Sequence, residues 1–461
     1  MTKEFYIIGG GIAGLVSAYE LSRKGHVVHV FEKHARFGGR IKTEYKDGKV
    51  LYETGPWRIH PSHTRLRKLL EKFGLEIKPI HHSIRRSGFG KTTTTSTSPT
   101  FSVSLTKFQQ SAMKTSIRNA NELMQKTGYD MSFQQIGDVD SITDKEDEDY
   151  FVVTTGFSSL VEKLVDYLEK HSSVHLYSNH MVQDITYSKQ YTISFTVREK
   201  KGYRHKTVSC EHVILAVTPS DLEKIPSLTI FPNTSTVSSL PLFHIMARSR
   251  NLSKSFGKLV CNSPISQIIS TCFDNEWFQI SYTSGRMAML LENLRLYSTS
   301  QWKNYLKEEF FKYFPSTLSI DSIRPYFWRN AVHYYHPNFK MSMNRLRDRN
   351  IYPHPRKYPN LYFIGESIST KQGWIEGSLE TVECFLRCLS TTSMSFSVEK
   401  PKEYVIYDNR ILNVEQWKLV HPGSTQVIEN HLGEDITDLW NQYHPRSASK
   451  YMIPLEVRRT H

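Results

Sequence analysis

Three glycines near the N-terminus have the spacing of a dinucleotide-binding turn. Gly9, Gly11 and Gly14 follow an apolar run, residues 5–8, and open a helix-like stretch, residues 15–22. Gly9 permits the tight turn, Gly11 lets the backbone approach a pyrophosphate, and Gly14 lets the helix pack on the strand. The free N–H groups at the start of the helix then favour phosphate. We therefore predict a dinucleotide site at this turn.

A carboxylate and a second glycine run follow at suitable distances. Glu32 ends the next apolar run, residues 27–31, 18 residues after Gly14. A carboxylate at this place can accept both hydroxyl hydrogen bonds of an adenosine ribose. Residues 36–40 read Arg-Phe-Gly-Gly-Arg, so Arg40 adds a cation to a close backbone approach that suits phosphate. The alternative interpretation is a glycine hairpin with a solvated arginine.

With these motifs, the chain resembles the flavin-containing amine oxidase family over about residues 3–390. Residues 53–58 and 65–75 are similar to the same region of L-amino-acid oxidases, and residues 362–366 and 373–377 resemble the closing flavin motif of the family. The resemblance implies an α/β, two-lobed FAD-binding amine-oxidase fold. Because residues 368–372 lack the cysteine that carries FAD in monoamine oxidases, we expect the FAD to be bound non-covalently.

The resemblance also implies roles for individual residues. Trp374 is expected to form an aromatic wall beside the flavin, unless it is a core tryptophan. Arg58 matches an arginine that pairs with the substrate carboxylate, although a contact to flavin or backbone is an equal alternative. The implied FAD contacts are Gly9, Gly11, Gly14, Glu32, Arg40, Val182, Gly365 and Glu366.

One family residue is missing. Relatives carry a lysine on the strand that follows an apolar run ending in proline, which is residues 213–219 in this chain. This lysine assists the reaction of reduced flavin with oxygen in several of them. Our sequence comparison places Ala247 at that position, with His244 and Arg248 as residues that could compensate. The absence weakens the case for oxygen as the electron acceptor.

The C-terminal residues resemble a cytochrome b5 domain. Residues 404–414 predict a hairpin, and His421-Pro-Gly precedes His444 by 23 residues. The resemblance implies that His421 and His444 bind the iron of haem b from both faces, in an apolar crevice. Ser424 replaces a family glycine, and the domain is short, so a degenerate domain without haem is the alternative. The predicted crevice residues are Leu419, Val427, Ile428, Leu432, Ile436, Leu439 and Trp440.

These motifs suggest how the chain is divided. We predict an amine oxidase-like domain over residues 1–389, a linker over 390–402 and a small α+β cytochrome b5-like domain over 403–461. Within the first domain, a substrate lobe is expected at about 61–149 and 241–324. An FAD lobe is expected to comprise about 1–60, 150–240 and 325–389. Further strands are expected at 174–177, 182–187, 191–197 and 213–217, and a substrate-side helix within 104–127.

Composition and charge limit the other functions and locations that the chain could have. The net charge of +14 is spread along the chain, which favours a basic solvated surface over nucleic-acid binding. Apolar runs are too short for a transmembrane helix, and no signal peptide is expected. Five scattered cysteines predict reduced thiols and an intracellular, cytoplasmic protein.

The sequence therefore predicts an FAD-dependent, amine oxidase-like oxidoreductase. It would oxidise a small amine or amino acid and pass electrons to oxygen or to the fused haem. Two alternatives remain: a flavin-binding interaction protein with decayed catalysis, and a flavoenzyme of the same fold that acts on a non-amine substrate.

Overall fold

The computed structural model describes the chain in segments. The described residues are 2–80, 84–88, 91–93, 150–228, 237–252, 256–261, 263–335, 343–353, 358–393, 403–407, 410–419, 425–437 and 439–440. The chain divides into two compact units, Met1–Phe385 and Leu386–His461, and each is described by itself. The helix predicted within 104–127 lies outside the described residues.

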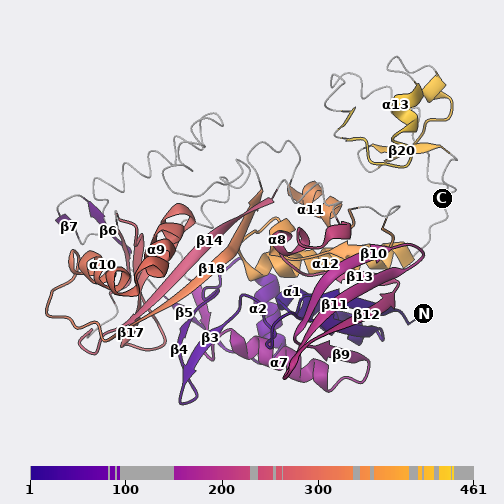
Figure 1. The fold of residues 1–461 in the computed structure, drawn as a ribbon. Coiled ribbons are helices and arrows are strands. Elements are labelled where there is room, and N and C mark those ends of the chain that lie inside the picture. The colour runs from indigo at the N-terminus through magenta and orange to yellow at the C-terminus, as the bar shows by residue number, and fades with distance from the viewer. Residues whose placement is uncertain are drawn as a thin grey trace. The chain divides into compact units, whose positions relative to one another are not determined.

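A five-stranded parallel sheet forms the centre of the first unit (Figure 1). Its order is β19-β13-β1-β2-β9, with β1 in the middle. Its strands are nearly continuous apolar runs, as expected when helices cover both faces of a parallel sheet. The strand bounds are Glu4–Ile8 for β1, Val27–Phe31 for β2, Val174–Tyr177 for β9, His212–Leu215 for β13 and Leu361–Phe363 for β19.

Helices and an antiparallel sheet surround this centre. Helix α1 packs against β2 and against α7, and its N-terminus follows the glycine turn directly. The antiparallel sheet has the order β10-β11-β12. The bounds are Ile12–Arg23 for α1, Ser158–Glu169 for α7, Pro219–Leu222 for α8, Met343–Ile351 for α11, Ile375–Ser393 for α12, His180–Tyr187 for β10, Tyr191–Glu199 for β11 and Gly202–Cys210 for β12.

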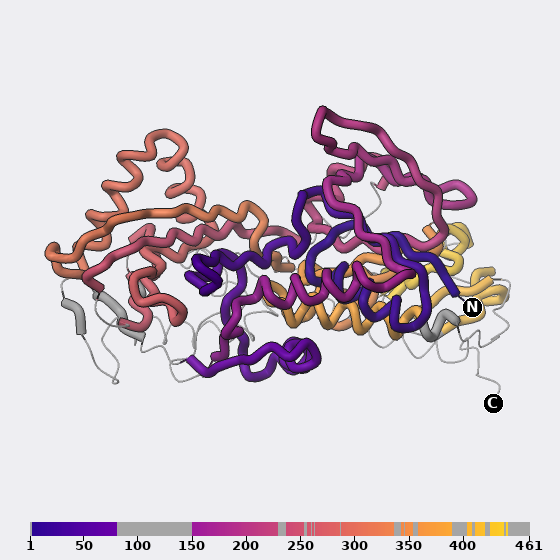
Figure 2. The backbone as a smooth tube through the Cα atoms, turned by 90° about the horizontal axis from the view of Figure 1, so that it is seen from below, coloured from indigo at the N-terminus to yellow at the C-terminus, as the bar shows by residue number. Residues whose placement is uncertain are grey.

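A seven-stranded sheet builds the second lobe of this unit. Its order is β18-β14-β17-β16-β15-β6-β7, and the long strands β14 and β18 extend side by side away from the parallel sheet (Figures 1 and 2). The bounds are Ser322–Tyr335 for β18, Val237–Arg248 for β14, Trp277–Ser284 for β17, Gln267–Ser270 for β16, Lys258–Val260 for β15, Ile84–Gly88 for β6 and Lys91–Thr93 for β7. Helices α9 (Gly285–Tyr297) and α10 (Thr299–Phe311) pack on one face of this sheet.

The side chains of β14 point alternately into two different environments. Phe243, Ile245 and Ala247 lie in the apolar core beneath α9 and α10. Leu242 and His244 lie on the other face, because successive side chains of a strand point to opposite sides. A core therefore forms on one face of the sheet, and the opposite face is available for a site.

Smaller pairs connect the lobes. Strands β3 (Thr43–Lys46) and β4 (Lys49–Glu53) form one antiparallel pair, and β5 (Ile77–Ile80) and β8 (Tyr150–Val153) form another. Helix α2 (Thr64–Lys72) begins where the Glu376 carboxylate accepts the Leu66 N–H at 2.9 Å, so an acid of α12 satisfies one free donor of α2.

The second unit contains the predicted hairpin. Strands β20 (Tyr404–Tyr407) and β21 (Arg410–Asn413) are antiparallel, and Ile406 also forms a bridge with Asp435. Helix α13 (Thr425–Glu429) and Trp440 pack on the hairpin around Val405 and Leu412. A small α+β core therefore forms from these few segments.

The described elements confirm several sequence predictions. Each strand expected before residue 218 is present within a residue or two of its predicted bounds. The predicted linker starts at residue 390, whereas α12 continues to Ser393, so residues 390–393 belong to the helix. Among the helices that the structure describes, none combines the length and apolar character that a membrane span requires.

Candidate active site

A single cavity of about 1070 Å³ connects most of the predicted site residues of the first unit. It lies in part beyond the carboxyl ends of β1 and β2, where ligands bind in open α/β sheets. Its volume slightly exceeds the roughly 300–1,000 Å³ range of small-molecule sites. Gly9, Gly11, Glu32, Arg40, Val182, Gly365, Glu366, Arg58 and Trp374 all line it. A ligand as large as FAD therefore has room here.

The glycine turn is shaped by close backbone contacts. A Cβ at Gly14 would lie 2.0 Å from the Gly9 carbonyl oxygen, and a Cβ at Gly9 would lie 2.4 Å from that of Ala216. Gly9 also has φ of +109°, which disfavours any larger residue. At Gly11, in contrast, no atom lies within 4 Å of the ideal Cβ position. Gly14 and Gly9 therefore hold the helix on the strand, whereas Gly11 faces open space in the cavity.

Glu32 is fixed by backbone donors. Its carboxylate accepts the Gly10 N–H and the His34 N–H, each at 2.9 Å, and the side chain is buried. Each carboxylate oxygen has a further acceptor site. The predicted ribose acid is therefore held in place at the cavity wall and can still accept hydroxyl groups.

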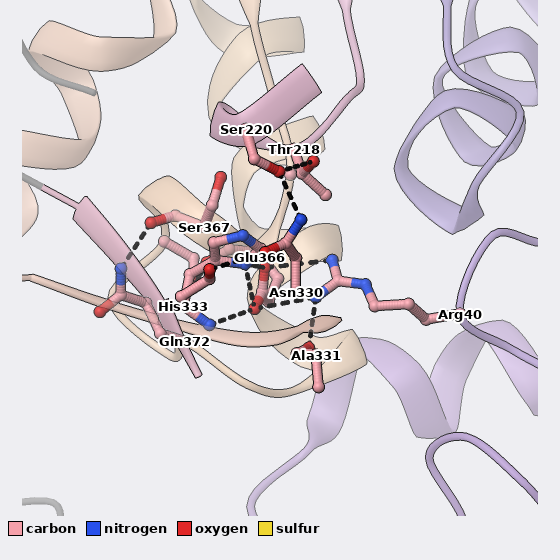
Figure 3. A network of polar contacts seen from close by, with 12 residues as sticks. Arg40, Thr218, Ser220, Asn330, Ala331, His333, Glu366, Ser367 and Gln372 are labelled. Carbon is pink, nitrogen blue, oxygen red and sulfur yellow. Dashed lines mark hydrogen bonds and ion pairs between the residues drawn. The ribbon is translucent and has the colours of Figure 1, made fainter. Parts of the chain in front are cut away.

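Arg40 has a protein partner that the sequence motif did not reveal. Its guanidinium donates to both oxygens of Glu366 at 3.2 Å and to the Ala331 carbonyl at 2.6 Å (Figure 3). The arginine follows the second glycine run, and the glutamate belongs to the closing motif, 326 residues later. Arg40 lines the cavity and is held there by its ion pair with Glu366, and its contact to FAD stays a prediction.

Glu366 is the centre of this network. The His333 N–H donates to its carboxylate at 3.1 Å, and His333 Nδ1 lies 3.0 Å from both carboxylate oxygens. Although burial opposes the charge, Arg40 and His333 hold the pKa of Glu366 well below its usual range. The side chain is therefore ionised at neutral pH, and it ties β18 and the N-terminal loop to the closing motif.

The other end of the cavity is aromatic. Trp57, Tyr150 and Ile269 form a buried cluster against which Trp374 and Tyr282 pack. The ring of His63 meets the Trp374 indole edge-on at 4.7 Å. Trp374 is half-buried and lines the cavity, so the expected aromatic wall is present in position, and its role beside a flavin stays a prediction.

Arg58 is positioned by these rings. Its guanidinium carbon lies 4.9 Å from the centroid of the Trp57 ring and 5.0 Å from that of Tyr150. Cation–π contacts of this kind hold an arginine against an apolar wall. Arg58 therefore brings a positive charge to the aromatic end of the cavity.

His244 lines the cavity, whereas the sequence comparison put Ala247 at the position of the missing lysine. It is buried, and its Nδ1 lies 3.0 Å from Nε2 of Gln279. Burial, together with the nearby charge of Arg58, lowers the pKa of His244 to about 3, so the ring is neutral at physiological pH. Ala247 lies in the core beneath α9 and α10, and the expectation that it occupies the flavin-facing position is not met. Because side chains alternate along β14, His244 faces the cavity in place of Ala247. Arg248, the other residue considered as a replacement for the lysine, pairs with Glu276.

The second unit is described only in part, and this part does not include the predicted haem ligands. His421 and His444 both lie outside the described residues. Of the predicted crevice residues, Ile428 and Trp440 are in the core, with Leu432 and Ile436 packed against it. Leu419 and Val427 are 66% and 44% exposed. Two exposed apolar side chains on either side of His421 in sequence fit a group that is itself apolar, such as haem.

Comparisons with known proteins agree with this geometry. The model of the flavin containing amine oxidoreductase family matches residues 12–129 and 131–381. The chain belongs to this family. Residues 392–461 match the cytochrome b5-like heme/steroid binding domain. Membership implies FAD as the cofactor of the first unit, and the second match implies haem.

Individual relatives are similar over shorter or more divergent stretches. L-amino acid oxidase Lm29 of Lachesis muta is 39% identical over 80 residues, 17% of this chain and 16% of that protein. The L-amino-acid oxidase of Gloydius blomhoffii is 41% identical over 76 residues, 16% of this chain and 15% of that protein. The chain thus matches about one sixth of the length of these curated relatives.

Solved structures share the fold over a much larger part. A protein described as a protoporphyrinogen oxidase from Exiguobacterium sp. 255-15 has a TM-score of 0.62 at 13% identity, and the match covers 85% of this chain and 99% of that one. Putrescine oxidase has a TM-score of 0.60 at 16% identity, with the same coverage. The first unit therefore has the two-lobed amine-oxidase fold that the sequence predicts.

Two substitutions in the glycine turn should separate FAD binding from folding. Gly11→Val should fold, because its side chain meets open cavity, but it should retain no FAD, because the side chain occupies the pyrophosphate position. Gly14→Val should instead destabilise the chain by overpacking, by roughly 1–3 kcal/mol or more. Visible absorption of the purified proteins and their urea unfolding measure the two effects. A yellow Gly11→Val protein would contradict the assignment.

The ion pair gives a second prediction. Glu366→Gln should lower the free energy of unfolding at pH 7 by roughly 1.5–3 kcal/mol, the range for hydrogen bonds to a charged group. The folded-state pKa of Glu366 is depressed, so the wild-type advantage is present above pH 4.5 and is lost as the pH falls below it. Urea unfolding at several pH values measures this.

The matched control is Glu383→Gln. Glu383 also pairs with an arginine, Arg65, but its side chain is exposed, so the substitution should cost at most about 1 kcal/mol. Equal losses of unfolding free energy in the two variants would show that the buried pair stabilises the fold no more than the exposed pair.

Proposed function

We propose that the chain is an FAD-dependent oxidoreductase that oxidises an amino acid or a related small amine. The observation that carries the proposal is the cavity, which runs from the glycine turn to an aromatic end that holds Arg58. When bound, FAD supplies the hydride acceptor for the carbon that bears the nitrogen. The residues that would hold it are the glycine turn, Glu32 and the backbone of the closing motif.

The protein's own residues supply binding and orientation. Arg58 binds the substrate carboxylate, because a guanidinium fork matches a carboxylate geometrically. Trp374 provides a flat wall that aligns the substrate and excludes water. His244 stays neutral and adds no positive charge, so a substrate ammonium is not repelled from β14.

We further propose the domain organisation predicted above, with the linker beginning after Ser393, an intracellular location, and oxygen or the haem as the electron acceptor. The scattered cysteines support the location, since none of the five, all of which are described residues, forms a disulfide. The absence of a lysine at His244 supports the haem as acceptor, because that lysine assists reaction with oxygen in relatives.

Anaerobic reduction of the flavin tests the proposed reaction. Arg58→Met should lower kcat/KM for amino acids by an amount equivalent to roughly 2–5 kcal/mol and leave simple amines little affected, because only a carboxylate loses its partner. Arg324→Met is the control, since Arg324 also stacks on a tryptophan, Trp277, but does not line the cavity. A flavin that no amine or amino acid bleaches would instead support a protein with decayed catalysis.

Haem binding is tested by the visible spectrum of the whole chain. Expressed with ample haem, the wild type should show a Soret band, and His421→Ala or His444→Ala should remove it while flavin absorption stays. His431→Ala is the control in the same unit, because the described hydrogen bond of the His431 side chain goes to Glu434, a surface residue. A wild-type chain without a Soret band would exclude the haem.

A further inference from the structure

The N-terminal end of α2 contacts the closing motif at two points on and beside Trp374. This helix lies within the region around residues 65–75 that resembles L-amino-acid oxidases, and no step of the proposed reaction uses it. Helix α2 packs into the first unit through Leu66, Leu69 and Leu70, which are buried. The end of a firmly packed helix can therefore serve as a fixed support for the residues that it contacts.

The first point of contact is a buried carboxylate. Glu376 lies two residues after Trp374, and its side chain is buried. One carboxylate oxygen accepts the backbone N–H and a guanidinium N–H of Arg65, each at 3.2 Å, and the other accepts the Leu66 N–H at 2.9 Å. Free N–H groups at a helix N-terminus favour an anion, because the helix dipole adds to the hydrogen bonds. The start of α12 is therefore tied to the start of α2 by several directional bonds.

The second point of contact is His63, the residue directly before α2. Its ring meets the Trp374 indole edge-on, with 4.7 Å between the ring centroids. The His60 N–H donates to Nδ1 of His63 at 3.2 Å, and this bond orients the ring. Burial lowers the pKa of His63 to about 3, so the ring is neutral at physiological pH. The indole thus has an oriented aromatic neighbour that comes from the same helix end as the partners of Glu376.

Close packing confines the backbone on either side of Trp374. Gly373 has φ of +82°, and a Cβ there would lie 3.0 Å from Cγ1 of Val332 in β18. A Cβ at Gly377 would lie 2.2 Å from the Lys371 carbonyl oxygen. The Gly377 N–H also donates to the Trp374 carbonyl at 3.1 Å. With the backbone confined in this way, contacts to the end of α2 are well placed to fix the indole itself.

We propose that the N-terminal end of α2 is a positioning element of the active site, in which Glu376 and His63 hold the Trp374 indole in the orientation that aligns the substrate. The proposal rests on the function proposed above and adds two positioning residues, neither of which lines the cavity. A displacement of about 1 Å in a group that aligns the substrate can cost roughly 100-fold in rate, because the reacting atoms leave their near-attack geometry.

A double-mutant cycle tests whether His63 acts through the indole. His63→Leu removes the edge-on ring but keeps an apolar side chain. It should retain FAD and lower kcat/KM for flavin reduction by roughly 10-fold, measured with the amino acid or amine that reduces the wild-type flavin fastest. In a Trp374→Phe background the same substitution should change kcat/KM by less than about 2-fold, because the group that it positions is gone.

Glu376→Gln tests the carboxylate, because the amide has nearly the same shape but cannot accept all three hydrogen bonds. It should retain FAD, lower kcat/KM by roughly 10-fold and lose this effect in the Trp374→Phe background. Glu383→Gln is the matched control. Glu383 also belongs to α12 and pairs with the guanidinium of Arg65, but its side chain is 51% exposed, so kcat/KM should change little.

Near-ultraviolet circular dichroism provides a readout without turnover. The difference between the spectra of the wild type and Trp374→Phe gives the signal of the Trp374 indole. This signal should change in His63→Leu and in Glu376→Gln, and it should stay the same in Glu383→Gln.

The outcomes separate the positioning role from the proposed function. If the indole signal is unchanged in both variants, or if their losses in kcat/KM persist in the Trp374→Phe background, the positioning proposal is wrong and the oxidase assignment stands. If no amino acid or amine reduces the wild-type flavin, the function proposed above fails, and the spectra still decide whether the end of α2 positions the indole.

Discussion

The ion pair between Arg40 and Glu366 joins the two halves of the nucleotide site. Its partners are 326 residues apart in sequence, and a buried histidine, His333, contacts the same carboxylate. An ionised carboxylate in the interior requires such partners, because desolvation alone would neutralise it. The glycine loop, the end of β18 and the closing motif therefore take their relative positions from one charged group, and the cavity forms between them.

The second constraint is the pleat of β14. Phe243, Ile245 and Ala247 complete the core beneath α9 and α10, and Leu242 and His244, which alternate with them, line the cavity. A shift of register by one residue would exchange these two sets and move His244 into the core. The apolar core of the second lobe thus decides which side chains meet a ligand.

Local patterns in the sequence were sufficient to predict the elements of the nucleotide half of the site. The apolar run before Gly9, the spacing to Glu32 and the strands expected before residue 218 match the described elements, because parallel strands and tight glycine turns depend on residues that are close in sequence. The family, the fold class and the β20–β21 hairpin followed from such local patterns as well.

The substrate half depended on tertiary structure. Strand β14 pairs with β17 and β18 through residues far apart in the chain. Its register, with bulges beside Leu242 and Ile245, is set by packing against α9 and α10. The sequence alone therefore assigned Ala247 to the wrong environment. Local spacing determined which residues could bind a dinucleotide; long-range packing and charge pairing decided which side chains face the substrate, because only the folded sheet brings those positions to one face.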